Sequence, residues 1–172
     1  SLLEFTPDDG NALSLSDADN INSTVQITVT NGTFTARTAT GVTITNNGTS
    51  VVILSGPIEH TGEVDAVRNS INDALDGARF NPTANYAGPA TLQMNSADVN
   101  GEVDFDIVDI TVAPINDPPA NVVSSPSQTA TEDVPKSLTL SVSDVDVGSS
   151  PLLITLTSNN GTLMTLPTIA SL

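Results

Sequence analysis

Three aspartates in the second half of the chain have the type and spacing to bind a metal cation. Asp144 and Asp146 stand two residues apart at the end of a predicted strand, so both side chains point to one face and could chelate together. Asp117 lies in a proline-rich joint earlier in the chain. Ca²⁺ takes six to eight oxygen ligands, mostly from carboxylates and carbonyls. The alternative is that these residues only shape turns, because Asp favours loop positions in any protein.

A second acidic group lies near the middle of the chain. It begins at Asp98 and continues with Glu102, Asp104, Asp106 and Asp109. The carboxylates of residues 102, 104 and 106 share one face of a predicted strand, where like charges at close spacing repel. A bound cation would relieve that repulsion. The alternative is a solvated outer face of a sheet.

The composition argues against catalysis and against several classes of partner. The 172 residues include 20 Asp and Glu against 4 Lys and Arg, and the net charge of −16 would repel nucleic acids and anionic lipid. With no Cys, no Trp, one Tyr and one His, the chain lacks the residues for thiolate sites, paired-histidine sites and sugar stacking. The chain has no Gly-x-Ser-x-Gly motif, so it lacks the hydrolase serine nucleophile that His60 could activate. No apolar run approaches the roughly 18 residues of a spanning helix. We therefore expect a non-enzymatic protein with no membrane insertion.

Apolar residues that alternate with polar ones predict β-strands along most of the chain. The predicted strands include residues 25–29, 33–37, 42–44, 51–54, 90–96 and 103–112. Asn31-Gly32 and Asn47-Gly48 divide the first four of these into two hairpins. In the last strand the apolar side chains change faces between Ile107 and Val108, which predicts a β-bulge.

One stretch departs from the strand pattern. Between residues 63 and 76, Val64, Val67, Ile71 and Leu75 recur at helical spacing, and Gly77 stands where a glycine commonly ends a helix. The pattern predicts a short helix packed across one end of a β-sandwich.

The chain repeats part of itself. Leu13–Asp19 recurs as Leu140–Asp146, 127 residues later, and the segment 27–30 recurs as 154–157 at the same offset. Between the copies lies Ile115-Asn116-Asp117-Pro118-Pro119, where two prolines stiffen the backbone. We predict a β-domain over residues 1–115, a linker over 116–120 and a partial second copy over 121–172.

The second copy stops after about a third of the repeat. Residues 120–172 offer about four strands, too few to close a sandwich and cover both sheet edges. Either the chain is a piece of something longer, or a neighbouring chain completes the second unit.

Several motifs occur along the chain in a fixed order: the segments 3–5 and 10–19, the segment 71–75, the following Phe80–Gly88, the joint at residues 115–119 and the segment 131–135. Together these motifs resemble the cadherin-like tandem repeats of large bacterial surface proteins and adhesins. The motifs cover nearly the whole chain and follow the order of the family. The resemblance implies a Greek-key β-sandwich with Ca²⁺ at the joints between successive domains.

The resemblance also implies a ligand set. Asn116 and Asp117 match the Asn-Asp linker of the family, and Asp144 and Asp146 match its Asp-x-Asp motif. The first copy of that motif, Asp17 and Asp19, would serve an upstream joint. Apart from the resemblance, Glu132 could reach either joint, and Asp98 is a further candidate. Two prolines of this chain stand at linker positions where the family has residues with oxygen-bearing side chains. The Asp-Arg-Glu motif of the family has no equivalent in the first domain. One or two ions are therefore expected rather than three.

Three functions are consistent with these observations. The first is an extracellular, cell-surface repeat that extends and stiffens a long bacterial protein, with Ca²⁺ fixing the angle to neighbouring repeats and with a surface or matrix ligand as a further partner. The second is a subunit of a filament or sheath whose incomplete second repeat is completed by an identical chain. The third is a carbohydrate-binding module of a secreted enzyme, which the low aromatic content disfavours.

Overall fold

The computed structural model describes residues 2–18, 22–58, 70–123 and 125–164. The chain forms two compact units, Ser1–Ile115 (unit 1) and Asn116–Leu172 (unit 2). Apart from one short helix, the regular elements are antiparallel β-strands, which confirms the predicted all-β class. No helix within the described ranges has the length and apolar character that a lipid bilayer requires of a spanning segment. Asp19, His60 and residues 63–69 of the predicted helix lie outside the described residues.

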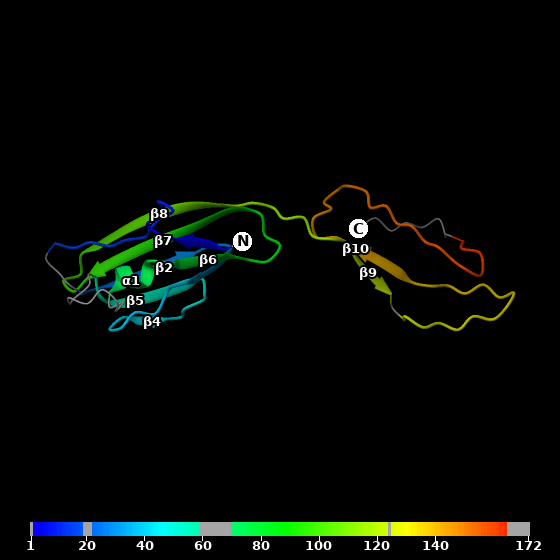
Figure 1. Ribbon diagram of the computed structural model, residues 1–172, viewed down its shortest axis with the longest axis horizontal. Coiled ribbons are helices and arrows are strands. Elements are labelled where there is room, and N and C mark those ends of the chain that lie inside the picture. The colour runs from blue at the N-terminus through cyan, green and yellow to red at the C-terminus, as the bar shows by residue number, and fades with distance from the viewer. Residues whose placement is uncertain (1, 19–21, 59–69, 124, 165–172) are drawn as a thin grey trace. The chain divides into compact units, whose positions relative to one another are not determined.

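Two antiparallel sheets form the β-sandwich of unit 1 (Figure 1). The larger sheet has the order β4-β5-β2-β7-β8, with bounds Thr43–Thr45, Val51–Pro57, Asn22–Val29, Gly88–Asp98 and Val103–Val112. The smaller sheet has the order β1-β6-β3, with bounds Leu3–Phe5, Ala78–Pro82 and Gly32–Thr35. The predicted hairpin over Asn47-Gly48 joins β4 to β5, and the last two predicted strands of this unit are β7 and β8.

The core of unit 1 lies between the two sheets. The smaller sheet contributes one buried phenylalanine from each strand, Phe5, Phe34 and Phe80. The facing strands of the larger sheet contribute buried aliphatic side chains: Val25, Ile27, Val52, Leu54, Leu92 and Met94. Burying each such side chain contributes about 1.5–3 kcal/mol, so this layer is the main source of the stability of unit 1.

The predicted hairpin over Asn31-Gly32 is wrong. β2 and β3 belong to different sheets, because both edges of β2 are already paired, with β5 and β7. Asn31 has a positive φ of 55°, but Gly32 does not, whereas a two-residue hairpin turn of type I′ requires positive φ at both central residues. The segment therefore carries the chain from one sheet to the other.

The predicted β-bulge in β8 is also wrong. The register runs without interruption from Gly88 opposite Val112 to Ala97 opposite Val103. Side chains alternate strictly along a regular strand, so Val108 and Ile110 face the core while the earlier apolar residues face the other side of the sheet. These residues, Val103, Phe105 and Ile107, are 79%, 64% and 57% exposed. The apolar pattern changes face because β8 has two apolar faces, one of them exposed to solvent.

The helix in the described part of the chain, α1, spans Ile71–Leu75, and Ser70 stands before its first residue. Ser70 caps it: the Ser70 hydroxyl accepts a hydrogen bond from the backbone N–H of Asp73, and the Asp73 carboxylate accepts one from the backbone N–H of Ser70. The backbone at Ser70 is extended, which sets the start of the helix. Gly77, with φ of 77°, follows the helix as predicted.

Unit 2 has two strands in its described part, β9 (Ala120–Val123) and β10 (Leu140–Ser143), which pair antiparallel. Within the described residues this is fewer strands than predicted, and residues 152–157 are not in a strand. Their counterparts in unit 1 lie in β2, which pairs with β5 on one side and with β7 on the other. The described part of unit 2 contains no strands equivalent to β5 and β7. As a result Leu153, Ile154 and Leu156 are 95%, 59% and 48% exposed.

Candidate functional site

Four of the predicted ligand residues come together in unit 2. The backbone N–H of Asp117 donates a hydrogen bond to Oδ2 of Asp146, at 2.5 Å. The backbone N–H of Asp146 donates to Oδ1 of Asp144, at 2.9 Å, and Nδ2 of Asn116 donates to the carbonyl oxygen of Asp117, at 3.1 Å. We call these four residues the unit-2 cluster. Residues almost 30 positions apart in the chain thus form one connected group.

The local structure of the unit-2 cluster follows from where β10 ends. Asp144 is the first residue after this strand, and its side chain accepts from the N–H two residues later, which is the geometry of an Asx turn. This bond turns Asp146 toward the start of the unit, where its carboxylate holds the backbone of Asp117. The aspartates therefore do shape turns, the alternative considered from the sequence, and each carboxylate oxygen retains a further lone pair.

A second group of acidic residues lines a pocket at one end of unit 1. The pocket has a volume of about 240 Å³ and lies where β7 turns into β8, the end opposite to where β8 leaves the unit (Figure 1). Its acidic lining residues are Asp17, Asp98, Glu102 and Asp104, and its hydroxyl-bearing lining residues are Ser16, Ser23 and Ser96. We call it the acidic pocket. It combines three segments: the loop after β1, the start of β2, and the β7–β8 hairpin.

The sequence prediction placed Asp98, Glu102 and Asp104 in one acidic group but assigned Asp17 to an upstream joint. Asp104 and Asp106 are exposed, as a solvated face requires, but they lie on the side of the sheet that carries Val108 and Ile110, beyond the end of the core. The pocket could be found only from the fold, because Asp17 and Asp98 are about 80 residues apart in the sequence.

Asp98 has a defined structural role within the acidic pocket. Its Oδ1 accepts hydrogen bonds from the backbone N–H groups of Asn100 and Glu102, at 2.9 and 2.8 Å, and its Oδ2 accepts one from Nδ2 of Asn100, at 3.2 Å. The carboxylate therefore closes the β7–β8 turn. The side chains of Glu102 and Asp104 are exposed.

The loop that carries Asp17 is held by the helix. The Asn72 side chain accepts a hydrogen bond from the backbone N–H of Leu15 and donates one to its carbonyl oxygen, both at 2.8 Å. Leu13 and Leu15 pack against the core of unit 1, and the end of the loop that follows them lines the pocket. This contact positions Asp17 beside the hairpin.

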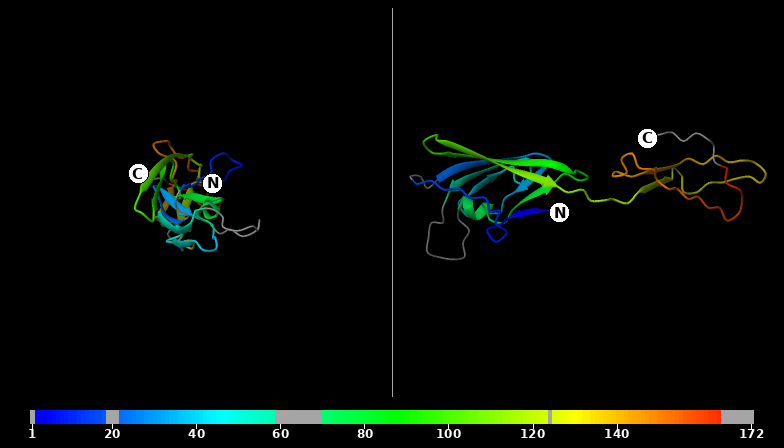
Figure 2. Two further views of the ribbon diagram at one scale, coloured as in Figure 1. Left: turned by 90° about the vertical axis from the view of Figure 1, so that its left-hand side faces the viewer. Right: turned by 90° about the horizontal axis from the view of Figure 1, so that it is seen from above.

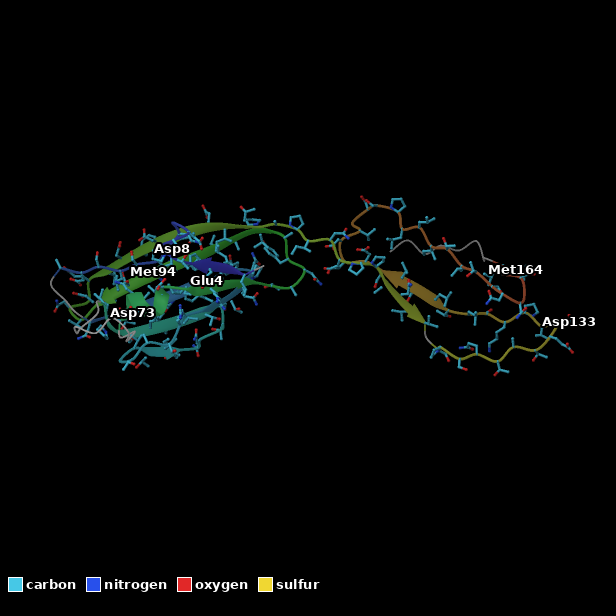
Figure 3. The ribbon with its side chains drawn as sticks, in the orientation of Figure 1. Glu4, Asp8, Asp73, Met94, Asp133 and Met164 are labelled. Carbon is cyan, nitrogen blue, oxygen red and sulfur yellow. The ribbon has the colours of Figure 1, made fainter. Side chains whose placement is uncertain are left out.

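Glu132 lies away from both groups. It stands in an exposed turn with Asp133, whose φ is 62°, and the backbone N–H of Val134 closes this turn on the carbonyl oxygen of Thr131. Asp133 marks the tip of unit 2, far from the segment with which the unit begins (Figure 3). The turn therefore does not contribute to the unit-2 cluster.

The unit-2 cluster and the acidic pocket offer the kind of ligand that suits Ca²⁺, but neither brings enough carboxylates close together. All their donors are oxygens, as this ion prefers. Within the described ranges, however, no three side chains of His, Cys, Asp or Glu are grouped so that they could hold a metal ion. No protein-family model, curated protein or solved structure matches this chain.

Proposed function

We propose that the chain is a non-enzymatic, extracellular repeat that extends and stiffens a long bacterial surface protein, with weak Ca²⁺ binding at its acidic groups. The observation that carries the proposal is the acidic pocket, where Asp17 from the loop after β1 and three acidic residues of the β7–β8 hairpin surround one hollow at an end of unit 1. An end of a domain is where a neighbouring repeat would meet it. The recurrence of Leu13–Asp19 as Leu140–Asp146 supports a tandem arrangement.

The proposed mechanism is electrostatic. In a chain of net charge −16, carboxylates that share a pocket repel one another and weaken the contact between the segments that carry them. A bound divalent cation would neutralise the negative charge of these carboxylates. Glu102 and Asp104 would then approach Asp17, with Asp98 held by the turn, while Asp144 and Asp146 would provide the carboxylates of the unit-2 cluster. Extracellular modules of this kind bind Ca²⁺ at about 10⁻⁴–10⁻³ M.

The test is thermal unfolding of unit 1 with about 2 mM Ca²⁺ and with chelator, at matched ionic strength. With the affinities just given, mass action predicts a stabilisation of about 0.6–1.8 kcal/mol, or a rise in Tm of several degrees. The double variant E102Q/D104N should lose most of this rise, because it removes two pocket carboxylates for which the structure shows no side-chain hydrogen bond.

The matched control is D106N/D109N. It removes the same charge from nearby positions of β8 that do not line the acidic pocket. The Ca²⁺-dependent rise in Tm should survive in this variant. If the wild-type chain shows no rise, or if both double variants reduce it equally, the proposed role of the pocket is wrong.

The exposed apolar residues of unit 2 favour a second candidate function, assembly through completion of this unit by another chain. Ile154 and Leu156 are the counterparts of Ile27 and Val29, which are buried in unit 1. Sedimentation velocity over a wide concentration range would detect such assembly. A sedimentation coefficient that does not change with concentration would exclude it for identical chains.

A further inference from the structure

β8 forms an edge of the larger sheet in unit 1. The strand order ends with β7 and β8, and no strand in the described part of the chain pairs with the other side of β8. Figures 1 and 2 show this strand at the margin of unit 1. It is ten residues long, contains no proline and has no bulge. Natural edge strands are usually short, bulged or interrupted by proline, because an open edge is a template for another strand.

The hydrogen-bonding pattern shows which residues present their backbone at this edge. The backbone N–H of Asp98 donates to the carbonyl oxygen of Glu102, at 3.0 Å, so these two residues form a hydrogen-bonded pair. Such pairs alternate along an antiparallel ladder. Asp104 and Asp106 therefore bond to β7. The residues between and beside them direct their N–H and C=O groups away from β7, toward solvent.

An independent contact on the other side of β7 agrees with this assignment. The backbone N–H of Thr30 donates to the carbonyl oxygen of Thr91, at 3.0 Å, so Thr91 directs its backbone toward the end of β2. Its neighbours Ala90 and Leu92 then direct theirs toward β8, where they lie opposite Ile110 and Val108. The even-numbered residues of β8 are thus engaged with β7, and the odd-numbered ones line the open edge.

Three of the residues with open backbone groups also have exposed apolar side chains. Val103, Phe105 and Ile107 each combine an outward backbone with a side chain that is more than half exposed. On the outer face beside Phe105, Thr24, Gln26 and Asn95 contribute to a shallow hollow of about 370 Å³. An added strand would place its own side chains next to this apolar row.

Charge decides what kind of strand can be added. Asp104 and Asp106 point to the other face of β8 and are exposed. If β8 of a second copy paired here about Phe105, Asp104 of each copy would lie opposite Asp106 of the other. Two chains of net charge −16 would also repel as they approach. A strand with Lys or Arg on that face would instead form opposite-charge pairs across the ladder.

We propose that the open edge of β8 binds an extended segment of another protein by strand addition. The segment alternates apolar residues, which pack beside Phe105, with Lys or Arg residues, which pair with Asp104 and Asp106. Backbone hydrogen bonds to Val103, Phe105 and Ile107 supply affinity, as in other cases of strand addition, and the two aspartates supply selectivity. The same aspartates protect the edge from pairing with another copy of this chain.

The experiment uses the full chain and a synthetic, end-capped peptide of about ten residues that alternates Lys with Val. Isothermal titration measures its affinity, and hydrogen exchange measures where it binds. We expect binding that weakens with salt, together with slower exchange of the amides of Phe105 and Ile107 in the complex. A peptide that alternates Glu with Val should not bind.

Two variants with equal changes of charge separate pairing from general attraction. D104N/D106N should weaken binding of the Lys-Val peptide by about fivefold or more, because the opposite-charge pairs are lost. E132Q/D133N removes two carboxylates from the turn of unit 2 and should change the affinity less than twofold. Absence of binding, equal effects of both variants, or binding without protection of the Phe105 and Ile107 amides would each overturn the proposal.

Discussion

At the scale of single residues, Gly32 shows how closely β3 and β6, neighbouring strands of the smaller sheet, pack against each other. A Cβ atom at this position would lie 2.4 Å from Cε2 of Phe80 and 2.6 Å from the carbonyl oxygen of Asn81. Phe80 is completely buried, and the carbonyl oxygen belongs to the paired backbone of β6. Neither group can move aside without disturbing the core. Gly32 is therefore required for packing, not for an unusual backbone angle.

We predict that Gly32→Ala lowers the free energy of unfolding of unit 1 by about 1–3 kcal/mol, since an inserted methyl group must displace packed atoms. Thermal or denaturant unfolding measures the change. Gly10→Ala is the comparison: at φ of 70° it costs about 1 kcal/mol in backbone strain, but its Cβ would meet no atom within 4 Å. A Gly32 variant no less stable than the Gly10 variant would contradict the packing argument.

At the scale of elements, α1 matters less for its own length than for what Asn72 holds. The helix has five residues, and its capping box and buried residues Ile71, Ala74 and Leu75 attach it to the sandwich. From this anchored position Asn72 binds both backbone groups of Leu15. A loop without strand partners is thereby fixed beside the β7–β8 hairpin, and the acidic pocket is complete.

Asn72→Ala should release this loop without changing any carboxylate. The loss of two partly buried hydrogen bonds should cost about 1–3 kcal/mol and increase exchange of the Leu15 amide. Asn72→Asp keeps an acceptor for the Leu15 N–H but loses the donor to its carbonyl oxygen, so its effect should be smaller. Equal exchange of the Leu15 amide in the wild-type chain and in Asn72→Ala would refute this role of the helix.

At the scale of the whole molecule, the two units differ in how much they bury. Unit 1 encloses a continuous apolar core, whereas no described residue of unit 2 is fully buried. The two methionines illustrate the contrast in Figure 3: Met94 is 9% exposed and lies within the sandwich, while Met164 is 78% exposed. A two-stranded sheet without a covered face is at best marginally stable in water.

We therefore predict one cooperative unfolding transition, contributed by unit 1. In hydrogen-exchange experiments, amides of β2 should be protected at least about a hundredfold more than those of β9 and β10. Under mild oxidation Met164 should convert to the sulfoxide well before Met94. Protection of β9 and β10 comparable to that of β2 would show instead that unit 2 forms a stable fold in this chain.

Local sequence was a good guide wherever local contacts decide the structure. The hairpin over Asn47-Gly48, the long strands β7 and β8, and the glycine that ends α1 all follow from short-range signals. The two wrong predictions share one cause: short-range signals do not show which segments a strand pairs with or packs against. Asn31-Gly32 crosses between sheets because β2 has both neighbours filled, and β8 needs no bulge because only one end of it meets the core.

The candidate site divides in the same way. The grouping of Asn116 and Asp117 with Asp144 and Asp146 was predictable, because a repeated motif and a joint marked these residues. The acidic pocket was not predictable as a unit. Its lining comes from a loop, a strand end and a hairpin, and only the packing of the sandwich brings these segments to one place.

The repeated motif separates what the sequence alone determined from what the tertiary structure decided. Leu-Ser-x-Ser-Asp occurs at residues 13–17 and at 140–144, and in both copies period-two alternation predicts an extended backbone with acidic residues at its end. In unit 2 this segment forms β10, paired with β9. In unit 1 it pairs with no strand and is held by Asn72. Alternation specifies the conformation of a strand, but the hydrogen bonds at its edges need a partner that only the rest of the fold can bring to it.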